Sequence, residues 1–250
     1  EAGNAVALMG NHEYNALCFN YEERKGGHVR EHSIKNILQH VETLRQFKGD
    51  QLAYDSTIEW FKTLPLYHES DEFRAVHACW DEGCIKLLRK HLKNGRLTEP
   101  LIRRSADEDD PIHEAVKVTL TGREIKLPKP LVITDKDGHE RSEMRIKWWV
   151  DPVGATYHSL GFPRPKQAPK EPIRPKLLKA ATRYPDNGKP VFFGHYWLQG
   201  APKLQNRNVC CLDYSVARKG QLLAYRFDGE RKLNKKNLVP VKTILLKKKR

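Results

Sequence analysis

The sequence predicts an α/β fold in which short strands deliver polar side chains at their ends. Three short apolar or β-favouring runs, at 5–9, 73–76 and 190–193, are each followed within three residues by a histidine. A short apolar run bounded by glycine is typical of a buried strand. In open α/β sheets, ligands bind beyond the carboxyl ends of the strands. We therefore expect the functional residues at these three strand ends.

Helices and strands are expected to alternate along the first half of the chain. After the strand at 5–9, a short helix is expected from Asn11 to about Leu17. A second helix is predicted at 31–47, because its apolar residues recur at steps of three and four. Further helices are expected at 57–62, capped by Ser56 and ended by Pro65, at 81–92, closed by Asn94-Gly95, and from 108–111 to about 118.

The second half is expected to consist mainly of strands. Segments 126–134 and 143–150 are predicted to pair as a hairpin through Asp137-Gly138. The proline-rich, basic stretch 163–189 is expected to form an extended surface loop. Three strands are then expected at 191–193, 209–212 and 222–226, with the last two antiparallel across Lys219-Gly220.

Composition limits the class of protein. The 250 residues suffice for one large α/β domain or two small ones, and 39% hydrophobic with 30% charged residues is typical of a soluble globular protein. No apolar run in the sequence is long enough to span a membrane, so we expect no membrane partner. The five cysteines are odd in number and include no C-x-x-C pair, which favours free thiols in a reducing cytoplasm.

The net charge of +14 is concentrated in two places. Segment 164–189 holds eight cations against Glu171 and Asp186, and segment 231–250 contains no acidic residue. Basic surfaces can steer an anionic substrate or bind nucleic acid. Because the basic residues are not interleaved with aromatic ones, nucleic acid is the disfavoured partner. For the tail, a solvated and frayed segment is the simpler interpretation.

Asn11, His12, His77 and His195 are the candidate functional residues, because each lies just beyond a predicted strand. Asparagine and histidine are neutral metal ligands, and histidine transfers protons near neutral pH. The alternatives are a helix N-cap for Asn11 and a structural role for each histidine. Metal sites on α/β folds take one ligand from each of several strand ends, so three such histidines favour a metal site.

Several short phrases spread over nearly the whole chain form a recognisable combination. They are residues 7–16, 76–80, 134–139, 147–149, 189–197, 211–215 and 223–230. Together they resemble the rear half of the signature of the calcineurin-like metallophosphoesterases. This family includes phosphoprotein phosphatases and symmetrical diadenosine tetraphosphatases, and the pattern is similar to that of a bacterial branch. One phrase alone is weak support, whereas their joint occurrence is specific.

The resemblance implies a four-layer α/β/β/α sandwich with metals at the strand ends. Residues 1–250 would form a single domain with an inserted segment at about 95–188. The implied reaction is hydrolysis of a phosphomonoester or phosphoanhydride at a dinuclear centre of Mn, Fe, Ni or Zn. The implied substrate is a phosphorylated small molecule, a nucleotide or a phosphoprotein. By this resemblance Asn11, His77 and His195 bind the second metal, and His12 protonates the leaving alkoxide.

The resemblance also implies roles for three further residues. Glu13 holds the turn or orients a histidine; the alternative is a first-turn carboxylate favoured by the helix dipole. Asp213 orients His195, or is an ordinary loop aspartate. Arg145 contacts phosphate, because residues 144–149 resemble a family phrase; the alternative is a solvated strand face.

The sequence also departs from the family. The motifs Gly-Asp-x-His and Gly-Asp-x-x-Asp-Arg-Gly, which supply the first metal site, the bridging aspartate and a phosphate-binding arginine, do not occur in it. We therefore expect an N-terminally truncated chain that lacks a βαβ unit, holds at most one partial metal site and is inactive by itself. The alternative function is a non-catalytic pseudo-phosphatase or a basic nucleic-acid-binding module.

Overall fold

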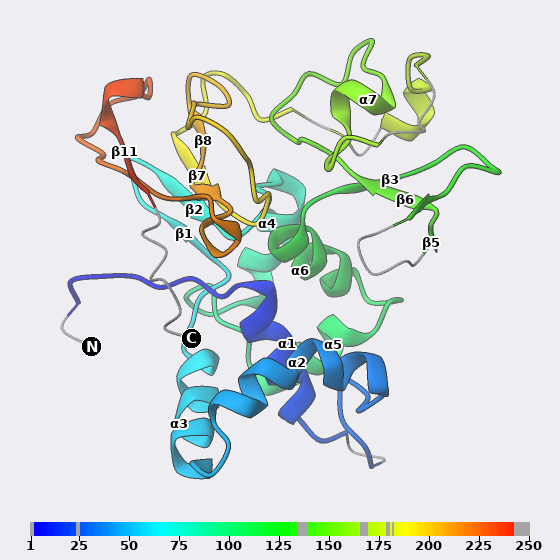
Figure 1. Ribbon diagram of the computed structural model, residues 1–250, viewed down its shortest axis with the longest axis vertical. Helices are drawn as coiled ribbons and strands as arrows, with labels where there is room; N and C mark the ends of the chain where they lie inside the picture. Colours follow the sequence, from blue (N-terminus) through cyan, green and yellow to red (C-terminus); the bar gives the residue numbers. More distant parts are fainter. Residues whose placement is uncertain are drawn as a thin grey trace, which may run out of the picture. The chain divides into compact units, whose positions relative to one another are not determined.

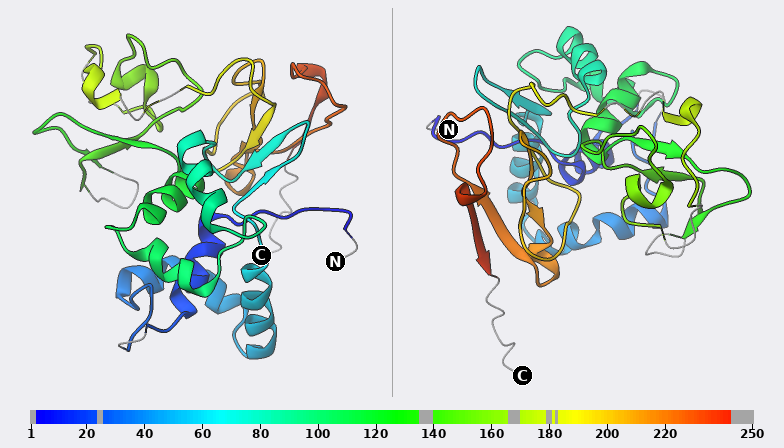
Figure 2. Two further views of the ribbon diagram at one scale, coloured as in Figure 1. Left: turned by 180° about the vertical axis from the view of Figure 1, so that it is seen from behind. Right: turned by 90° about the horizontal axis from the view of Figure 1, so that it is seen from above.

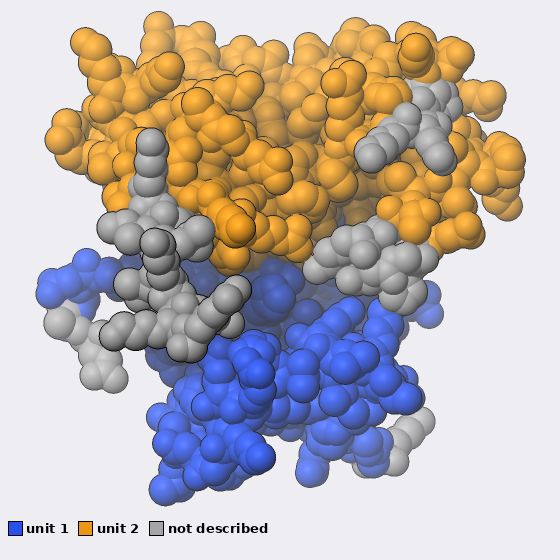
Figure 3. Space-filling model, in the orientation of Figure 1, with its two compact units in different colours: residues 1–68, 82–120 blue, residues 69–81, 121–250 orange. Residues whose placement is uncertain are grey.

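The computed structural model describes residues 3–23, 26–134, 140–165, 170–178, 181 and 183–242. The chain divides into two units (Figure 3). Unit 1 comprises Glu1–His68 and Glu82–Leu120, and unit 2 comprises Glu69–Asp81 and Thr121–Arg250. Helices occur together with parallel and antiparallel strands, which confirms the general α/β class. A single domain with an insertion at about 95–188 stays a prediction.

Unit 1 is built from helices. Helix α1 (Asn11–Asn20) contacts α3 (Gln51–Lys62) and α5 (Glu99–Ala106) (Figure 1). The other helices are α2 (Ile34–Gln46), α4 (Glu82–His91) and α6 (Pro111–Thr121). Apolar side chains from these helices form the interior, and the fully buried ones include Leu17, Ile85, Leu88, Ile102, Ile112 and Leu120. Within the described ranges, every helix is too short or too polar to cross a membrane.

Polar side chains fasten α1 to its neighbours. The Tyr14 hydroxyl lies 2.8 Å from the Ser105 hydroxyl of α5. The Asn20 amide donates to the Tyr54 hydroxyl of α3 at 2.7 Å. The same hydroxyl lies 3.0 Å from Nε2 of the buried His40 on α2. Because buried polar groups are costly without partners, these bonds fix the position of α1 in unit 1.

A mixed sheet positions the candidate residues of unit 2. Its order is β1 (Tyr67–Glu69), β2 (Arg74–Val76), β7 (Val191–Phe193) and β8 (Val209–Cys211), and the division between the units falls within β1. β2, β7 and β8 are parallel, and all residues of β7 and β8 are buried. Continuous apolar strands of this kind are typical of a parallel sheet covered on both faces. Because β2, β7 and β8 run in the same direction, their carboxyl ends lie at the same edge of the sheet.

A second, antiparallel sheet follows β8. It has the order β11 (Leu238–Lys242), β10 (Gln221–Tyr225) and β9 (Asp213–Tyr214), and the β10–β11 hairpin is drawn in orange to red in Figures 1 and 2. Two short 3₁₀ helices, Val216–Arg218 and Lys235–Asn237, lie in its connections. A cluster of buried side chains joins β7 and β8 to these connections, and its centre is Phe192, Cys210 and Leu233.

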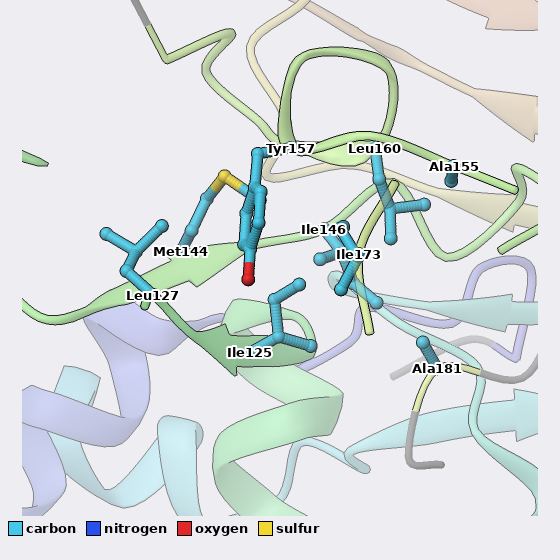
Figure 4. Close-up of a cluster of buried hydrophobic side chains, with 9 residues drawn as sticks. All are labelled: Ile125, Leu127, Met144, Ile146, Ala155, Tyr157, Leu160, Ile173 and Ala181. Atoms are coloured by element: carbon cyan, nitrogen blue, oxygen red, sulfur yellow. The ribbon is translucent and has the colours of Figure 1, made fainter. Parts of the chain in front are cut away.

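A separate apolar cluster is formed by a two-part hairpin and the segments that follow it. β3 (Glu124–Lys126) pairs with β6 (Glu143–Arg145), and β4 (Ile133–Thr134) pairs with β5 (Glu140–Arg141). Helix α7 (Tyr157–Leu160) and the 3₁₀ helix Pro175–Leu178 complete this part. Figure 4 shows the buried side chains that these segments share, which are Ile125, Leu127, Met144, Ile146, Ala155, Tyr157, Leu160, Ile173 and Ala181.

Aromatic side chains link this hairpin to the sheet. The ring centroids of Trp148 and Trp149 lie 4.9 and 5.0 Å from that of Phe193 on β7. Trp149 also lies 4.8 Å from Tyr196, which is fully buried. Close packing of aromatic rings of this kind stabilises a core. The tryptophan pair is therefore part of the interior of unit 2.

The predicted strand at 5–9 is wrong. Residues 5–7 are exposed, with Val6 60% accessible, and the described residues before α1 pair with no strand. Only near its end is the segment anchored, where the Met9 N–H donates to the carbonyl of Pro65 at 2.9 Å. A strand requires a partner for its backbone groups, and the apolar pattern alone does not supply one.

Helix boundaries were predicted with mixed success. α1, α2, α4 and α6 overlap their predicted ranges. α3 begins at Gln51 rather than 57, because Asp50 caps it by accepting the Ala53 N–H at 3.0 Å. Helix α5 and strand β1 were not predicted. The apolar face of α2 is not part of the interior, since Ile34 is 80% exposed.

The pairing predicted for the last strands is also corrected. β8 pairs in parallel with β7, and the short β9 after it is the antiparallel neighbour of β10. β11 adds a strand within the segment that was expected to be a frayed tail. The hairpin of 126–134 with 143–150 is present in a shorter form, and its predicted turn, Asp137-Gly138, lies outside the described residues. Residues 135–139 of the phrase 134–139 and residues 243–250 of the tail also lie outside the described residues.

Candidate functional site

His77 and His195 lie side by side at the edge of the sheet in unit 2. In the parallel β2–β7 pair Val76 is opposite Phe193, so the two strands end together. The Gly194 N–H donates to the carbonyl of His77 at 2.9 Å, which continues the pairing beyond the strands. His77 Nε2 and His195 Nδ1 are 3.2 Å apart, and the ring centroids are 5.0 Å apart. Two of the three predicted metal ligands are therefore together.

The backbone at His195 adopts an uncommon conformation. Its φ is +65°, in the left-handed region, which costs a residue with a side chain about 1–2 kcal/mol. Such strain persists only where the surroundings impose it, and it concentrates at functional sites. The left-handed conformation of His195 turns the chain sharply after Gly194. The imidazole of His195 therefore lies next to that of His77.

Asp213 holds this turn through the backbone. One of its carboxylate oxygens accepts the Trp197 N–H at 3.0 Å, and the other accepts the Ser215 N–H at 3.0 Å. Its carbonyl accepts the Leu198 N–H at 2.9 Å. The Ser215 hydroxyl donates to the Trp197 carbonyl at 2.8 Å. The Asp213 carboxylate thus fixes the loop that carries His195.

The loop after His77 is anchored on two sides. The Trp148 indole N–H donates to the carbonyl of Ala78 at 2.9 Å. Asp81 forms an ion pair with Arg123 at 2.8 Å, and each side chain is only 13% exposed. A mostly buried, hydrogen-bonded ion pair has a defined geometry. These contacts fix the direction in which the chain leaves β2.

The separation of the two imidazoles fits two ligands of one metal ion. Nitrogen ligands bind zinc at about 2.0–2.1 Å, which places two of them about 3.3 Å apart in tetrahedral geometry. The observed distance of 3.2 Å is close to that value. The same distance suits a hydrogen bond from one neutral imidazole to the other, so a metal titration must separate the two cases.

Other metal ligands are not gathered around this pair. Among the residues that the structure describes, no group of three or more His, Cys, Asp and Glu side chains could hold a metal ion. A metal at His77 and His195 therefore needs further ligands of another kind. The sequence predicts one such ligand, the amide oxygen of Asn11.

Asn11, His12 and Glu13 occupy the first turn of α1 in unit 1. Glu13 accepts the Gly10 N–H at 2.9 Å, which is the bond expected of a residue that holds the turn. His12 is exposed, and it is close enough to the buried His40 to contribute to the lowering of that residue's pKa, after burial and Arg30. The predicted roles of Asn11 and His12 beside His77 and His195 stay predictions.

Arg145 lies on the same unit as the histidine pair. Its guanidinium carbon is 5.8 Å from the ring centroid of Tyr196, the residue after His195. Burial lowers the pKa of Arg145, because the charged guanidinium is removed from water. A desolvated cation next to the His195 loop is suited to bind a phosphoryl oxygen. The predicted role of Arg145 in binding phosphate stays a prediction.

The cysteines are chemically quiet. All five are buried, and none of them is part of a disulfide. Burial raises the pKa of Cys210 to about 12 and that of Cys18 to about 11. A protonated thiol is neither a strong nucleophile nor a metal ligand. Thiol chemistry is therefore not expected at these two positions near neutral pH.

Lys147 is a functional candidate that the sequence analysis did not single out. It follows Arg145 by two residues, and the burial of residues 143–147 alternates. In an extended segment this spacing places two side chains on one side. The signal was present in the sequence as basic residues alternating with Met144 and Ile146.

The chain matches no protein-family model and no curated protein. The resemblance to the metallophosphoesterases therefore stays a prediction from the sequence motifs.

Proposed function

We propose that this protein is a metal-dependent phosphoesterase of the calcineurin-like class, which hydrolyses a phosphomonoester or a phosphoanhydride. The observation that carries the proposal is the His77–His195 pair at the ends of two adjacent parallel strands, with a nitrogen separation of 3.2 Å. The four-layer sandwich and a cytoplasmic location belong to the same proposal.

His77 and His195 would hold a divalent metal through Nε2 and Nδ1. Asn11 would add an amide oxygen, and Mn, Fe, Ni or Zn all accept such a set of nitrogen and oxygen ligands. In a dinuclear site, metals lower the pKa of a bound water and neutralise charge on the attacking and leaving oxygens. The remaining tasks fall to side chains of the protein.

Arg145 would bind and orient the phosphoryl group through its guanidinium donors. The oxygen of water forms a bond to phosphorus and releases one proton to the solvent, while the bond from phosphorus to the leaving oxygen breaks. His12, exposed at the start of α1, would give a ring N–H proton to that leaving oxygen. Asp213 keeps the His195 loop in place during these changes.

The test is Mn²⁺-dependent hydrolysis of p-nitrophenyl phosphate. It is carried out on the 250-residue chain and on the chain extended by any residues that its reading frame encodes upstream. We expect turnover by the extended chain, with a loss of at least about 100-fold in His195→Ala and in His12→Ala. Exposed His91 on α4 provides the control, and His91→Ala should retain activity.

Two outcomes would contradict the proposal. Turnover that persists undiminished in His12→Ala and His195→Ala would mean that the reaction takes place elsewhere. An extended chain that binds metal and phosphate without turnover would instead be a non-catalytic binding protein.

A further inference from the structure

A second group of cations lies beside the candidate site in unit 2. Lys147 is half-buried, and Arg164 and Lys203 are exposed near it. Burial lowers the pKa of Lys147, and the positive charges of Arg164 and Lys203 lower it further. Like charges that lower one another's pKa lie within the range of direct electrostatic interaction.

The backbone holds these three cations together. The Lys147 N–H donates to the carbonyl of Leu160, and the Phe162 N–H donates to that of Arg145, both at 2.8 Å. These bonds bring the segment of Arg164 alongside that of Lys147. On another side, the Asn206 amide donates to the Trp149 carbonyl at 2.7 Å and ties the segment of Lys203 to it.

The segment of Lys203 is also fixed at its own position. The Lys203 N–H donates to the Tyr214 hydroxyl at 2.9 Å, and this hydroxyl lies 3.2 Å from the Lys203 carbonyl. Tyr214 follows Asp213, which holds the His195 loop. Lys203 is therefore linked through β9 to the loop that carries His195.

Carboxylates do not balance these charges. Among the described residues, no Asp or Glu forms an ion pair with Lys147, Arg164 or Lys203. The Arg164 Nε–H donates to Nδ1 of His158 at 3.5 Å, a long hydrogen bond to a side chain that carries no negative charge. Three neighbouring cations that have no carboxylate partner among the described residues are costly for the folded protein and favourable for an anion.

Arg145 lies on the same extended segment as Lys147. Met144 and Ile146 point into the apolar cluster (Figure 4), so Arg145 and Lys147 point to the opposite side of the same extended segment. Two residues along a strand span about 6.6 Å. An anion with adjacent phosphate groups could contact both side chains.

We propose that Lys147, Arg164 and Lys203 form an anion subsite for a second phosphate group of the substrate. The substrate class is then a phosphoanhydride, a molecule with adjacent phosphates, rather than a simple phosphomonoester. This assignment of substrate class rests on the proposed phosphoesterase function. The anion subsite itself can be tested without it.

The test is calorimetric titration of the 250-residue chain with sodium pyrophosphate and, separately, with sodium orthophosphate, in buffer without divalent metal. We expect the chain to bind pyrophosphate more tightly. Lys147→Met should weaken pyrophosphate binding about tenfold, and Lys203→Met about threefold, because the exposed cation is more strongly screened. Orthophosphate binding should change by less than about twofold in both variants.

Matched variants separate this site from the general basic character of the chain. Lys147→Arg keeps the charge and should bind pyrophosphate nearly as the unaltered chain does. Lys232→Met removes one charge from another exposed lysine of unit 2 and should have no effect. Circular dichroism checks the folding of each variant, and the exposed Lys203→Met carries the test if Lys147→Met does not fold.

The inference is overturned if pyrophosphate affinity stays within twofold in Lys147→Met and Lys203→Met, or if Lys232→Met weakens it equally. It is also overturned if the two phosphate probes lose affinity in equal measure. Failure of the phosphoesterase proposal would look different, because p-nitrophenyl phosphate would not be hydrolysed while pyrophosphate binding still depended on Lys147.

Discussion

His77 Nε2 and His195 Nδ1 lie 3.2 Å apart, although 118 positions separate the two residues in the sequence. The parallel pairing of β2 with β7 brings the strand ends together, and the positive φ of His195 completes the approach. Imidazoles on neighbouring strand ends can bind a common ion only if both strands and the intervening turn are held.

Gly122 provides a close test of the packing around Tyr196. Its φ is +92°, and an added Cβ would lie 2.5 Å from the Tyr196 hydroxyl and 3.1 Å from Cδ of Arg145. Gly122→Ala should therefore combine backbone strain with overpacking and lower the free energy of unfolding by about 3 kcal/mol. Urea unfolding measures the loss.

Gly154 serves as the matched control for Gly122. Its φ is +66°, and nothing lies within 4 Å of an added Cβ. Gly154→Ala should lower the free energy of unfolding by only about 1 kcal/mol, from backbone strain alone. Equal losses in the two variants would show that Tyr196 is not packed against Gly122 as described.

Asp213 should stabilise the His195 loop through two backbone hydrogen bonds. Asp213→Ala leaves the N–H groups of Trp197 and Ser215 without this acceptor, which should cost about 3 kcal/mol of unfolding free energy. Asp213→Asn keeps one acceptor oxygen and should cost about half as much. Urea unfolding of both variants measures the difference, and an unaffected Asp213→Ala would contradict the loop-holding role.

Gly194, the residue before His195, should tolerate alanine. An added Cβ would lie 3.6 Å from both the Asp213 Cβ and the His77 carbonyl, which is ordinary contact. Gly194→Ala should change the unfolding free energy by less than about 1 kcal/mol.

Gly220 gives the opposite expectation in the same unit. An added Cβ would lie 1.9 Å from the Tyr214 carbonyl oxygen, so the backbone must move. Gly220→Ala should cost more than about 2 kcal/mol, again by urea unfolding. If Gly194→Ala proves the more damaging of the two, the geometry of the His195 turn is wrong.

Stability should fall in mild acid because of His40. Burial, followed by the charges of Arg30, His12 and His32, lowers the pKa of His40 below its ordinary 6.5. The folded state therefore binds fewer protons than the unfolded state, and stability is lost as the pH falls from above 6.5 to the folded-state pKa. Urea unfolding at pH 7.5 and 5.5 measures this loss.

His40→Gln isolates this contribution. The amide of glutamine does not titrate and can still bond to the Tyr54 hydroxyl, which lies 3.0 Å from Nε2 of His40. The loss of stability between the two pH values should be smaller in this variant. A loss as large as in the unaltered chain would assign the pH dependence to other groups.

Local patterns in the sequence located most helices and the strands that carry His77 and His195. Periodic apolar residues and capping residues are short-range signals, and they reported α2 and α4 correctly. The strand predicted at 5–9 failed because strand formation depends on a partner elsewhere in the chain. The same limit explains why β9 rather than β8 pairs with β10.

The sequence predicted which histidines belong to the candidate site, but it did not predict how they come together. The sequence indicated that His77 and His195 follow strands, and the register of β2 against β7 then brought them together. Convergence of Lys147 with Arg164 and Lys203 depends on contacts between distant segments, which no local pattern encodes. Likewise, the turn-holding bonds of Asp213 depend on the fold of the His195 loop.

The most direct test of the central claim is titration of the 250-residue chain with Mn²⁺ and with Zn²⁺ by calorimetry. We predict that His77→Ala and His195→Ala each weaken metal binding at least about 100-fold, that the double variant is little worse than either, and that His91→Ala has no effect. Metal affinity within twofold of the unaltered chain in both single variants would contradict the account and leave the imidazole pair as an internal hydrogen bond.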